Sequence, residues 1–214
     1  MILLKSRQEI ERMRAASGIV AEILAEIRSH VRAGVTTGEL DSLAEELTRT
    51  KGAVPAFKGY AVAGRVFPAS ICISINDEVV HGVPSRQRAL KAGDIVGLDF
   101  GVSYQGYYGD AAMTVPVGRV TAEAERLMEV TSGALRAGIE AIAPGRHVED
   151  ISAAIQDAAE GAGYSLVRKL TALGRALPRT RIQSSPHSTE TPASRSLSMR
   201  ALRCSARAPR SNTL

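Results

Sequence analysis

Two aspartates lie in apolar segments of the sequence, where a carboxylate is costly unless something compensates its charge. Asp99 follows Ile95-Val96-Gly97-Leu98, and Asp110 precedes Ala111-Ala112-Met113. Both segments have the composition of strands, and residues 103–106 between them have the composition of a turn. The sequence therefore predicts a β-hairpin over about residues 93–117, with one aspartate on each strand.

The position of the turn decides how the two carboxylates meet. A turn centred between Tyr104 and Gln105 would place Asp99 directly opposite Asp110, with Cβ atoms about 5 Å apart. A centre one residue later would make them diagonal neighbours on the same face of the ladder. In either register, two ionised carboxylates close together in apolar strands would repel each other.

A hard divalent cation would remove this repulsion, because carboxylate oxygens are the ligands that such ions prefer. The pattern therefore indicates a metal site built on Asp99 and Asp110. The alternative is that one or both side chains face solvent or belong to backbone turns. Asp77 and Asp94, in the same stretch, are interpreted as turn residues without a role.

His81 is the histidine nearest to this hairpin in the sequence. It follows Val79-Val80 and precedes Gly82-Val83-Pro84, which predicts a strand that runs into a turn. An imidazole titrates near neutral pH and could transfer a proton during catalysis. For an isolated histidine, a structural role is the alternative.

The rest of the chain predicts helices around this region of strands. Capping patterns and helical spacing indicate four helices, and strands are expected from about residue 54 to 117. The expected helices cover about residues 6–34, 36–51, 121–144 and 148–161. The segment 34–52 matches 145–163 at a shift of 111 positions, and a long helix precedes each segment. This internal repeat predicts two helix–helix–sheet halves.

The composition changes at Thr171. From there to Leu214 the chain has eight arginines, one acidic residue and no Phe, Tyr, Trp or Val. Such a segment buries little apolar surface, so we predict a disordered or out-of-frame tail. The remainder is nearly neutral. Two cysteines, no signal-peptide core and no membrane span lead us to expect a cytoplasmic protein.

Three ordered motifs stand out in the first 170 residues, together with an opening segment and an aromatic segment. They are Asn76-Asp77-Glu78-Val79-Val80-His81-Gly82-Val83-Pro84, Gly93-Asp94-Ile95-Val96-Gly97-Leu98-Asp99, Gly106-Tyr107-Tyr108-Gly109-Asp110-Ala111-Ala112, Lys5-Ser6 with Glu9-Ile10 and Met13-Arg14, and Phe57-Lys58-Gly59-Tyr60. Together they resemble the type I methionine aminopeptidases.

This resemblance implies an α+β pita-bread fold with pseudo-twofold helix–helix–sheet halves. We expect a metallopeptidase domain over residues 1–170, with its second half incomplete, followed by the tail 171–214. The implied activity is removal of the initiator methionine from nascent polypeptide N-termini, with the ribosome as one expected place of action. The resemblance implies no nucleic-acid or membrane partner, and we expect a monomer.

The resemblance also implies roles for individual residues. Asp99 and Asp110 would contact a pair of divalent ions (Co, Mn, Fe, Zn or Ni), and His81 would bind the substrate peptide and assist catalysis. The pocket for the methionine side chain would be lined by four residues, for which an ordinary core position is the alternative: Phe57, Tyr60, Phe67 and Cys72.

The family's site uses five protein side chains, and three have no match in this sequence. Leu173 stands where the third ligand, a histidine, is expected, and Glu190 is the tail's only acidic residue. We interpret this as a shift of reading frame near Thr171, and we expect weak or partial metal binding and impaired activity. The alternatives are a non-catalytic pita-bread binding protein and an inactive truncated gene product.

Overall fold

The computed structural model describes residues 4–62 and 64–166. The predicted tail, and the place where the repeat would require a second set of strands, lie outside these residues. The described chain forms two units, which we treat separately: residues 4–121 with helices α1 and α2 and the strands, and residues 122–166 with helices α3 and α4. Within the same residues, none of the helices combines the length and hydrophobicity that spanning a bilayer requires.

Helices α1 (Arg7–His30) and α2 (Thr37–Thr50) begin at the capping patterns predicted from the sequence. Ser6 caps α1, and Thr36 caps α2. At Thr36, the backbone N–H donates to Glu39 Oε2 at 2.7 Å, and Glu39 N–H donates back to Thr36 Oγ1 at 3.2 Å. These reciprocal bonds satisfy backbone donors that the first helical turn leaves without a partner in the helix.

Strand β5 lies at the centre of the main sheet of the first unit. It is antiparallel to β6 along its whole length, and its other edge pairs with β4 and then β1. A separate pair, β2 and β3, forms a short hairpin. The strands are β1 (Val54–Pro55), β2 (Ala61–Val62), β3 (Arg65–Val66), β4 (Ile71–Ile75), β5 (Ile95–Tyr104) and β6 (Tyr107–Pro116).

The predicted hairpin is confirmed, but the predicted turn centre between Tyr104 and Gln105 is wrong by one residue. Tyr104 pairs with Tyr107, so the turn consists of Gln105 and Gly106, with φ angles of 49° and 80°. Two-residue turns with positive φ at both positions match the twist of a hairpin, and glycine adopts such angles without strain. The register therefore follows from the place of Gly106.

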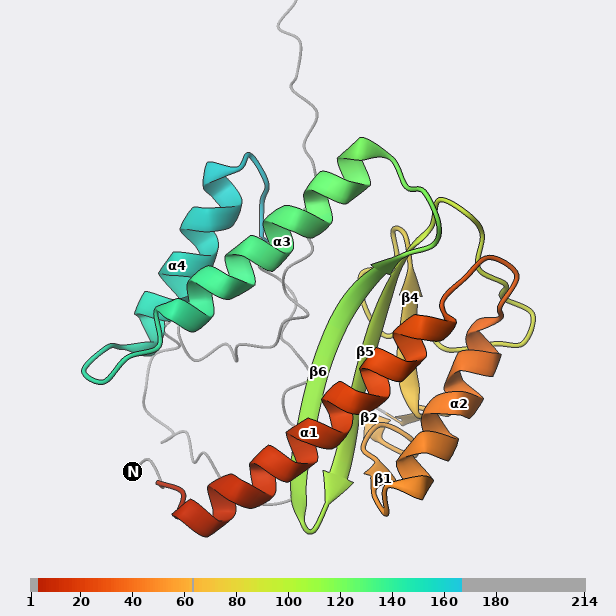
Figure 1. The fold of residues 1–214 in the computed structure, drawn as a ribbon, viewed down its shortest axis with the longest axis horizontal. Helices are drawn as coiled ribbons and strands as arrows, with labels where there is room; N and C mark the ends of the chain where they lie inside the picture. The colour runs from red at the N-terminus through yellow and green to blue at the C-terminus, as the bar shows by residue number, and fades with distance from the viewer. Residues whose placement is uncertain (1–3, 63, 167–214) are drawn as a thin grey trace, which may run out of the picture. The chain divides into compact units, whose positions relative to one another are not determined.

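The core of the first unit lies on one face of this sheet. Helix α1 crosses β5 and β6, and α2 lies beside it (Figure 1). Alternate residues of β5 point into this core, because side chains alternate between the two faces of a strand. The largest buried side chains include Phe100, Leu98, Ile71, Ile73, Ile23, Leu24, Ile27 and Leu40.

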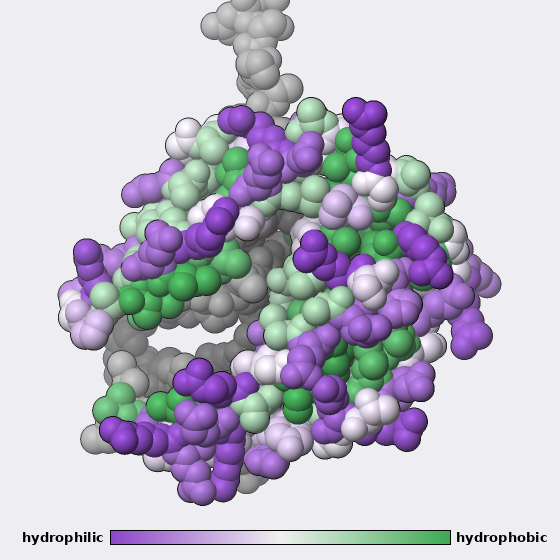
Figure 2. Space-filling view, viewed as in Figure 1, coloured by the Kyte–Doolittle hydropathy of each residue, from purple (hydrophilic) through white to green (hydrophobic). Residues whose placement is uncertain are grey.

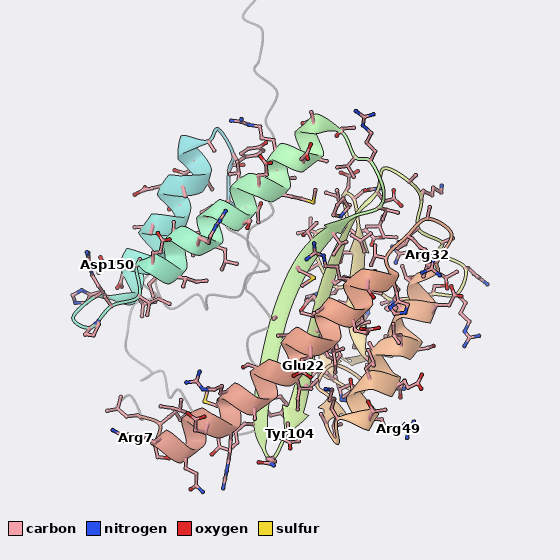
Figure 3. The ribbon with its side chains drawn as sticks, viewed as in Figure 1. Arg7, Glu22, Arg32, Arg49, Tyr104 and Asp150 are labelled. Atoms are coloured by element: carbon pink, nitrogen blue, oxygen red, sulfur yellow. The ribbon has the colours of Figure 1, made fainter. Side chains whose placement is uncertain are left out.

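Helices α3 (Ala122–Glu140) and α4 (Val148–Gly161) form the second unit and repeat the plan of α1 and α2. The bounds of α4 are those of α2 shifted by 111 positions. Gly34 and Gly145, the equivalent loop glycines, both have positive φ, at 87° and 83°. His147 N–H donates to Asp150 Oδ2 at 2.9 Å, as Thr36 N–H does to Glu39 (Asp150 is labelled in Figure 3). The predicted repeat is confirmed for the helices.

Candidate metal and substrate site

The sheet face opposite α1 and α2 carries three of the residues that the sequence singles out, namely Cys72, Asp99 and Asp110. We call it the Asp99 face, and it comprises Cys72, Ser74, Gly97, Asp99, Gly101, Asp110 and Ala112. Cys72 of β4 lies directly opposite Asp99, and Ala112 of β6 lies opposite Asp99 on the other side. Because side chains alternate along a strand, the large core residues of β4, β5 and β6 point to the other face.

Asp99 and Asp110 are diagonal neighbours on this face. Asp99 pairs with Ala112 and Asp110 with Gly101, so the direct pairing predicted from the earlier turn centre is wrong, and the diagonal alternative is confirmed. Diagonal neighbours in a sheet are about 7–8 Å apart, somewhat less between Cβ atoms. This spacing leaves room for a cation between the two carboxylates.

The two carboxylates differ in exposure. Asp99 is 8% exposed, with Oδ1 shielded from solvent, whereas Asp110 is exposed. A buried carboxylate is stable only with compensating charge or hydrogen bonds, and a bound cation is one form of such compensation. Two carboxylates do not complete a cation site: within residues 4–62 and 64–166, no cluster of three or more His, Cys, Asp or Glu side chains could hold a metal ion.

Phe57 lies against the Asp99 face. A Cβ atom built on Gly101 would be 3.0 Å from Phe57 Cε1 and 3.3 Å from Cζ, so the ring occupies the space that a side chain at Gly101 would take. The backbone supports this position, because Ala56 N–H donates to the Gly101 carbonyl at 2.9 Å. The structure thus brings together Phe57, Cys72, Asp99 and Asp110.

Tyr60 and Phe67 lie at the base of the β2–β3 hairpin, in the same segment as Phe57. Phe67 N–H donates to the Tyr60 carbonyl at 2.9 Å, and Tyr60 N–H donates to the Phe57 carbonyl at 3.0 Å. All three rings are half-buried, and none belongs to the hydrophobic cores of the described residues. Cys72, in contrast, is buried at 4% exposure. The described residues thus enclose these rings only in part.

His81 does not lie in a strand, and this part of the prediction is wrong. β4 ends at Ile75, and the chain reverses at Asn76 and Asp77 and runs back beside β4. Ile73 N–H donates to the Gly82 carbonyl at 2.9 Å. A Cβ on Gly82 would lie 2.0 Å from the Ile73 carbonyl oxygen, so only glycine allows this approach. His81, with φ of 57°, is thereby fixed at the outer edge of β4.

Two acidic residues near the site were missed in the sequence. Asp41 Oδ1 accepts from Ser70 N–H at 2.7 Å and from Ile71 N–H at 3.2 Å. Burial raises the pKa of the Asp41 carboxyl above its ordinary value, against the lowering effect of these two hydrogen bonds. Glu45 Oε1 and Oε2 accept from Lys58 Nζ at 2.6 and 2.7 Å. The partners are distant in sequence, so no local pattern could have revealed these contacts.

The match to a known protein family gives the class of this protein. The model of metallopeptidase family M24 matches residues 11–191, so the chain belongs to this family. Membership of a metallopeptidase family implies a divalent metal cofactor. The α+β fold is the pita-bread fold of the family, as predicted from the resemblance.

Within the family, the chain is similar to the bacterial methionine aminopeptidases. It is 46% identical to methionine aminopeptidase of Aquifex aeolicus over 168 residues, 78% of this chain and 65% of the relative. It is 41% identical to methionine aminopeptidase 1 of Bacillus subtilis over 174 residues, 81% and 68% of the two chains. The crystal structure of the Rickettsia prowazekii methionine aminopeptidase matches with a TM-score of 0.75 and 41% identity, covering 80% of this chain and 67% of that one. The chain thus spans about two thirds of these relatives.

Proposed function

We propose that this chain carries the substrate side and part of the metal site of an aminopeptidase that removes N-terminal methionine from nascent proteins in the cytoplasm. The observation that carries the proposal is the arrangement of the Asp99 face. One buried and one exposed carboxylate share that face with a buried thiol and with Phe57. The similarity to methionine aminopeptidases supports the assignment of substrate.

Asp99 and Asp110 are the proposed metal ligands. Divalent ions bound by carboxylates act as Lewis acids and lower the pKa of a bound water, which is the chemistry that such a cofactor supplies. Because the two carboxylates fit only part of a site, we assign them charge compensation and ligation and derive no hydrolytic step from them. The ions proposed from the family resemblance are two of Co, Mn, Fe, Zn or Ni, held weakly here.

The methionine side chain would contact Phe57, Tyr60, Phe67 and Cys72. A thioether is soft and flexible, and it packs well against aromatic edges and sulfur. The half-burial of the three rings favours this role over the alternative of ordinary core positions. His81 would bind the substrate peptide and move a proton, with its place fixed by the close approach of Gly82 to β4.

We further propose that the chain engages nascent polypeptide N-termini as a monomer, at the ribosome, without specific nucleic-acid or membrane partners. Its domain covers residues 1–170, and 171–214 is an out-of-frame tail that lacks three family ligands. On this basis its activity is impaired. The alternatives are a non-catalytic pita-bread protein that binds peptides and an inactive truncated product. An incomplete set of metal ligands favours these alternatives over an active enzyme.

Metal titration of the whole chain tests the carboxylate assignment. We expect Mn²⁺ or Co²⁺ to bind weakly to the purified chain in calorimetry, and the Asp99→Asn variant to lose this binding. Asp77→Asn is the matched control, because Asp77 is exposed in the turn after β4 and makes the same change of charge. Equal binding by the Asp99→Asn variant and the parent chain would show that Asp99 is no ligand.

His81→Ala tests the separate role of the histidine. It should leave Mn²⁺ binding unchanged and weaken binding of a Met-Ala-Ser peptide to the chain. Loss of Mn²⁺ binding together with peptide binding would mean that His81 ligates the ion.

A further inference from the structure

The segments that carry the proposed methionine-binding residues are both fastened to helix α2. One is the start of β4, which leads directly into Cys72. The other is the segment 57–67, which carries Phe57, Tyr60 and Phe67. Neither fastening belongs to the sheet hydrogen bonding, and both use carboxylates that the proposed chemistry does not employ.

The first fastening joins Asp41 to the start of β4. A single carboxylate oxygen, Asp41 Oδ1, accepts from the backbone N–H groups of Ser70 and Ile71. Both of those residues are fully buried, so their amide groups have little access to water if the carboxylate is removed. Cys72 follows immediately, and it lies opposite Asp99 on the Asp99 face.

The second fastening joins Glu45 to the aromatic segment. Both carboxylate oxygens of Glu45 lie within 2.7 Å of Lys58 Nζ, and Lys58 stands between Phe57 and Tyr60. Both side chains are nearly half exposed, and exposed ion pairs contribute little to overall stability. Any effect of this pair is therefore expected on the segment around Lys58 and not on the stability of the whole unit.

Asp41 and Glu45 are one helical turn apart, which places them on the same side of α2. We propose that these two carboxylates are positioning residues for methionine recognition: Asp41 sets the place of Cys72, and Glu45 sets the place of the aromatic rings. They act through β4 and Lys58 and do not contact the substrate. This inference rests on the proposed function, since it concerns the same methionine-binding residues.

Side-chain discrimination by the whole chain tests the proposal. L-methionine and L-alanine are titrated into the protein, and binding is followed by NMR. Because binding buries the methionine side chain, the parent chain should bind L-methionine about ten times more tightly than L-alanine. This ratio should fall towards one in Asp41→Ala and in Glu45→Ala. The Asp41→Asn variant keeps an acceptor oxygen, so it should retain the affinity ratio of the parent chain. Glu46 is an exposed acidic residue on the same helix, and Glu46→Ala should leave the ratio unchanged.

Peptide-resolved hydrogen exchange on the same proteins locates the effect. Asp41→Ala should speed exchange in residues 69–73, and Glu45→Ala in residues 56–60, with β5 and β6 unchanged. Retained discrimination despite this local loosening would overturn the inference and leave the proposed function standing. Faster exchange throughout β5 and β6 would also overturn it, since the carboxylates would then be general stabilisers. A parent chain that does not distinguish methionine from alanine would overturn the proposed function, and the inference with it.

Discussion

Helices α2 and α4 occupy equivalent places in the internal repeat, and each has 14 residues, yet they bury different amounts of their apolar faces. Leu40 of α2 is 1% exposed, whereas its counterpart Ile151 of α4 is only partly buried. Thr37 is fully buried, but its counterpart Val148 is half exposed. Figure 2 shows hydrophobic surface over the α3–α4 pair.

The difference between the two helix pairs lies in what they pack against. α1 and α2 bury their apolar faces against β4, β5 and β6. In the described residues, the core of α3 and α4 consists of the small residues Ala134 and Ala159 together with Tyr164. An amphipathic pattern therefore determines which face of a helix can be buried, while a sheet determines how much stability that face contributes.

Catalysis by the whole chain is the test with the largest expected effect. Two carboxylates from the first unit alone leave most positions around a divalent ion to water. We therefore expect no detectable release of methionine from Met-Ala-Ser with added Co²⁺ or Mn²⁺, while Bacillus subtilis methionine aminopeptidase 1 in the same assay provides the positive control. Measurable release by the purified chain would mean that residues beyond those described complete the site.

Truncation of equivalent helix residues compares the two pairs directly. Leu40→Ala should lower the free energy of unfolding by about 3 kcal/mol, because it leaves a cavity in a closed core. Ile151→Ala should cost about 1 kcal/mol or less, because its side chain is already partly hydrated. Urea unfolding followed by circular dichroism measures both, and equal losses would show that the two faces are equally well packed.

Two buried glycines make close contacts of different kinds. Gly109 lies against backbone in the first unit, and Gly138 lies against a side chain in the second. A Cβ on Gly109 would lie 2.5 Å from the Ala16 carbonyl oxygen of α1, whereas on Gly138 it would meet the side chain of Ile155 at 2.6 Å. Backbone cannot move aside, so Gly109→Ala should cost about 2 kcal/mol. In Gly138→Ala the side chain of Ile155 must shift, and the better helix propensity of alanine offsets part of that cost, so the loss should be about 1 kcal/mol.

Gly18→Ala is the control for these glycine variants. Gly18 lies in α1 with nothing near its Cβ position, so alanine should stabilise the protein by about 0.5–1 kcal/mol. The thermal midpoints of the three variants should rank Gly18→Ala highest and Gly109→Ala lowest. A Gly109→Ala variant as stable as the parent chain would contradict the close packing of α1 on β6.

The smallest expected effect concerns Asp41 and pH. Burial raises the pKa of Asp41 above its ordinary value of 3.8, with Glu45 raising it further and Lys58 lowering it. The folded state then holds this proton more tightly than the unfolded state, so the carboxyl's contribution to stability falls as the pH rises from the ordinary pKa through the raised one. Asp41→Asn has no such ionisation.

The stability of Asp41→Asn relative to the parent chain should therefore increase with pH across this acidic range and stay constant above it. Urea unfolding at a series of pH values measures the difference. A difference that shrinks as the pH rises would mean that the two backbone hydrogen bonds outweigh burial at Asp41.

Much of the fold could be predicted from local patterns. The capping residues Ser6 and Thr36 mark the starts of α1 and α2 in the sequence, and helical spacing located α3 and α4. Local patterns also predict the hairpin, but its register depends on which residues adopt positive φ, and Gly106 does so without strain. The diagonal placement of Asp99 and Asp110 follows from this one turn.

The parts of the site that could not be predicted depend on long-range contacts. The apolar neighbours of His81 predict a strand, yet the reversal at Asn76 carries His81 to the edge of β4. The contact of Phe57 with Gly101 joins residues 44 positions apart. Asp41 and Glu45 each bind partners more than ten positions away, and no periodic pattern encodes such pairs.

The diagonal pair Asp99 and Asp110 also bears on the order in which the protein assembles. The two carboxylates belong to one hairpin with a two-residue turn, and a hairpin of this kind closes within about 1–10 μs. The contact of Ala16 with Gly109 instead requires a loop of more than 90 residues to close, which is slower because long loops lose more entropy on closure. Helix α1 precedes β6 by more than 70 residues in the chain, so it is synthesised first and can contact β6 only after the hairpin has emerged. The two strands of the hairpin are neighbours in the chain, so they can pair with a smaller loss of entropy than α1 and β6 can.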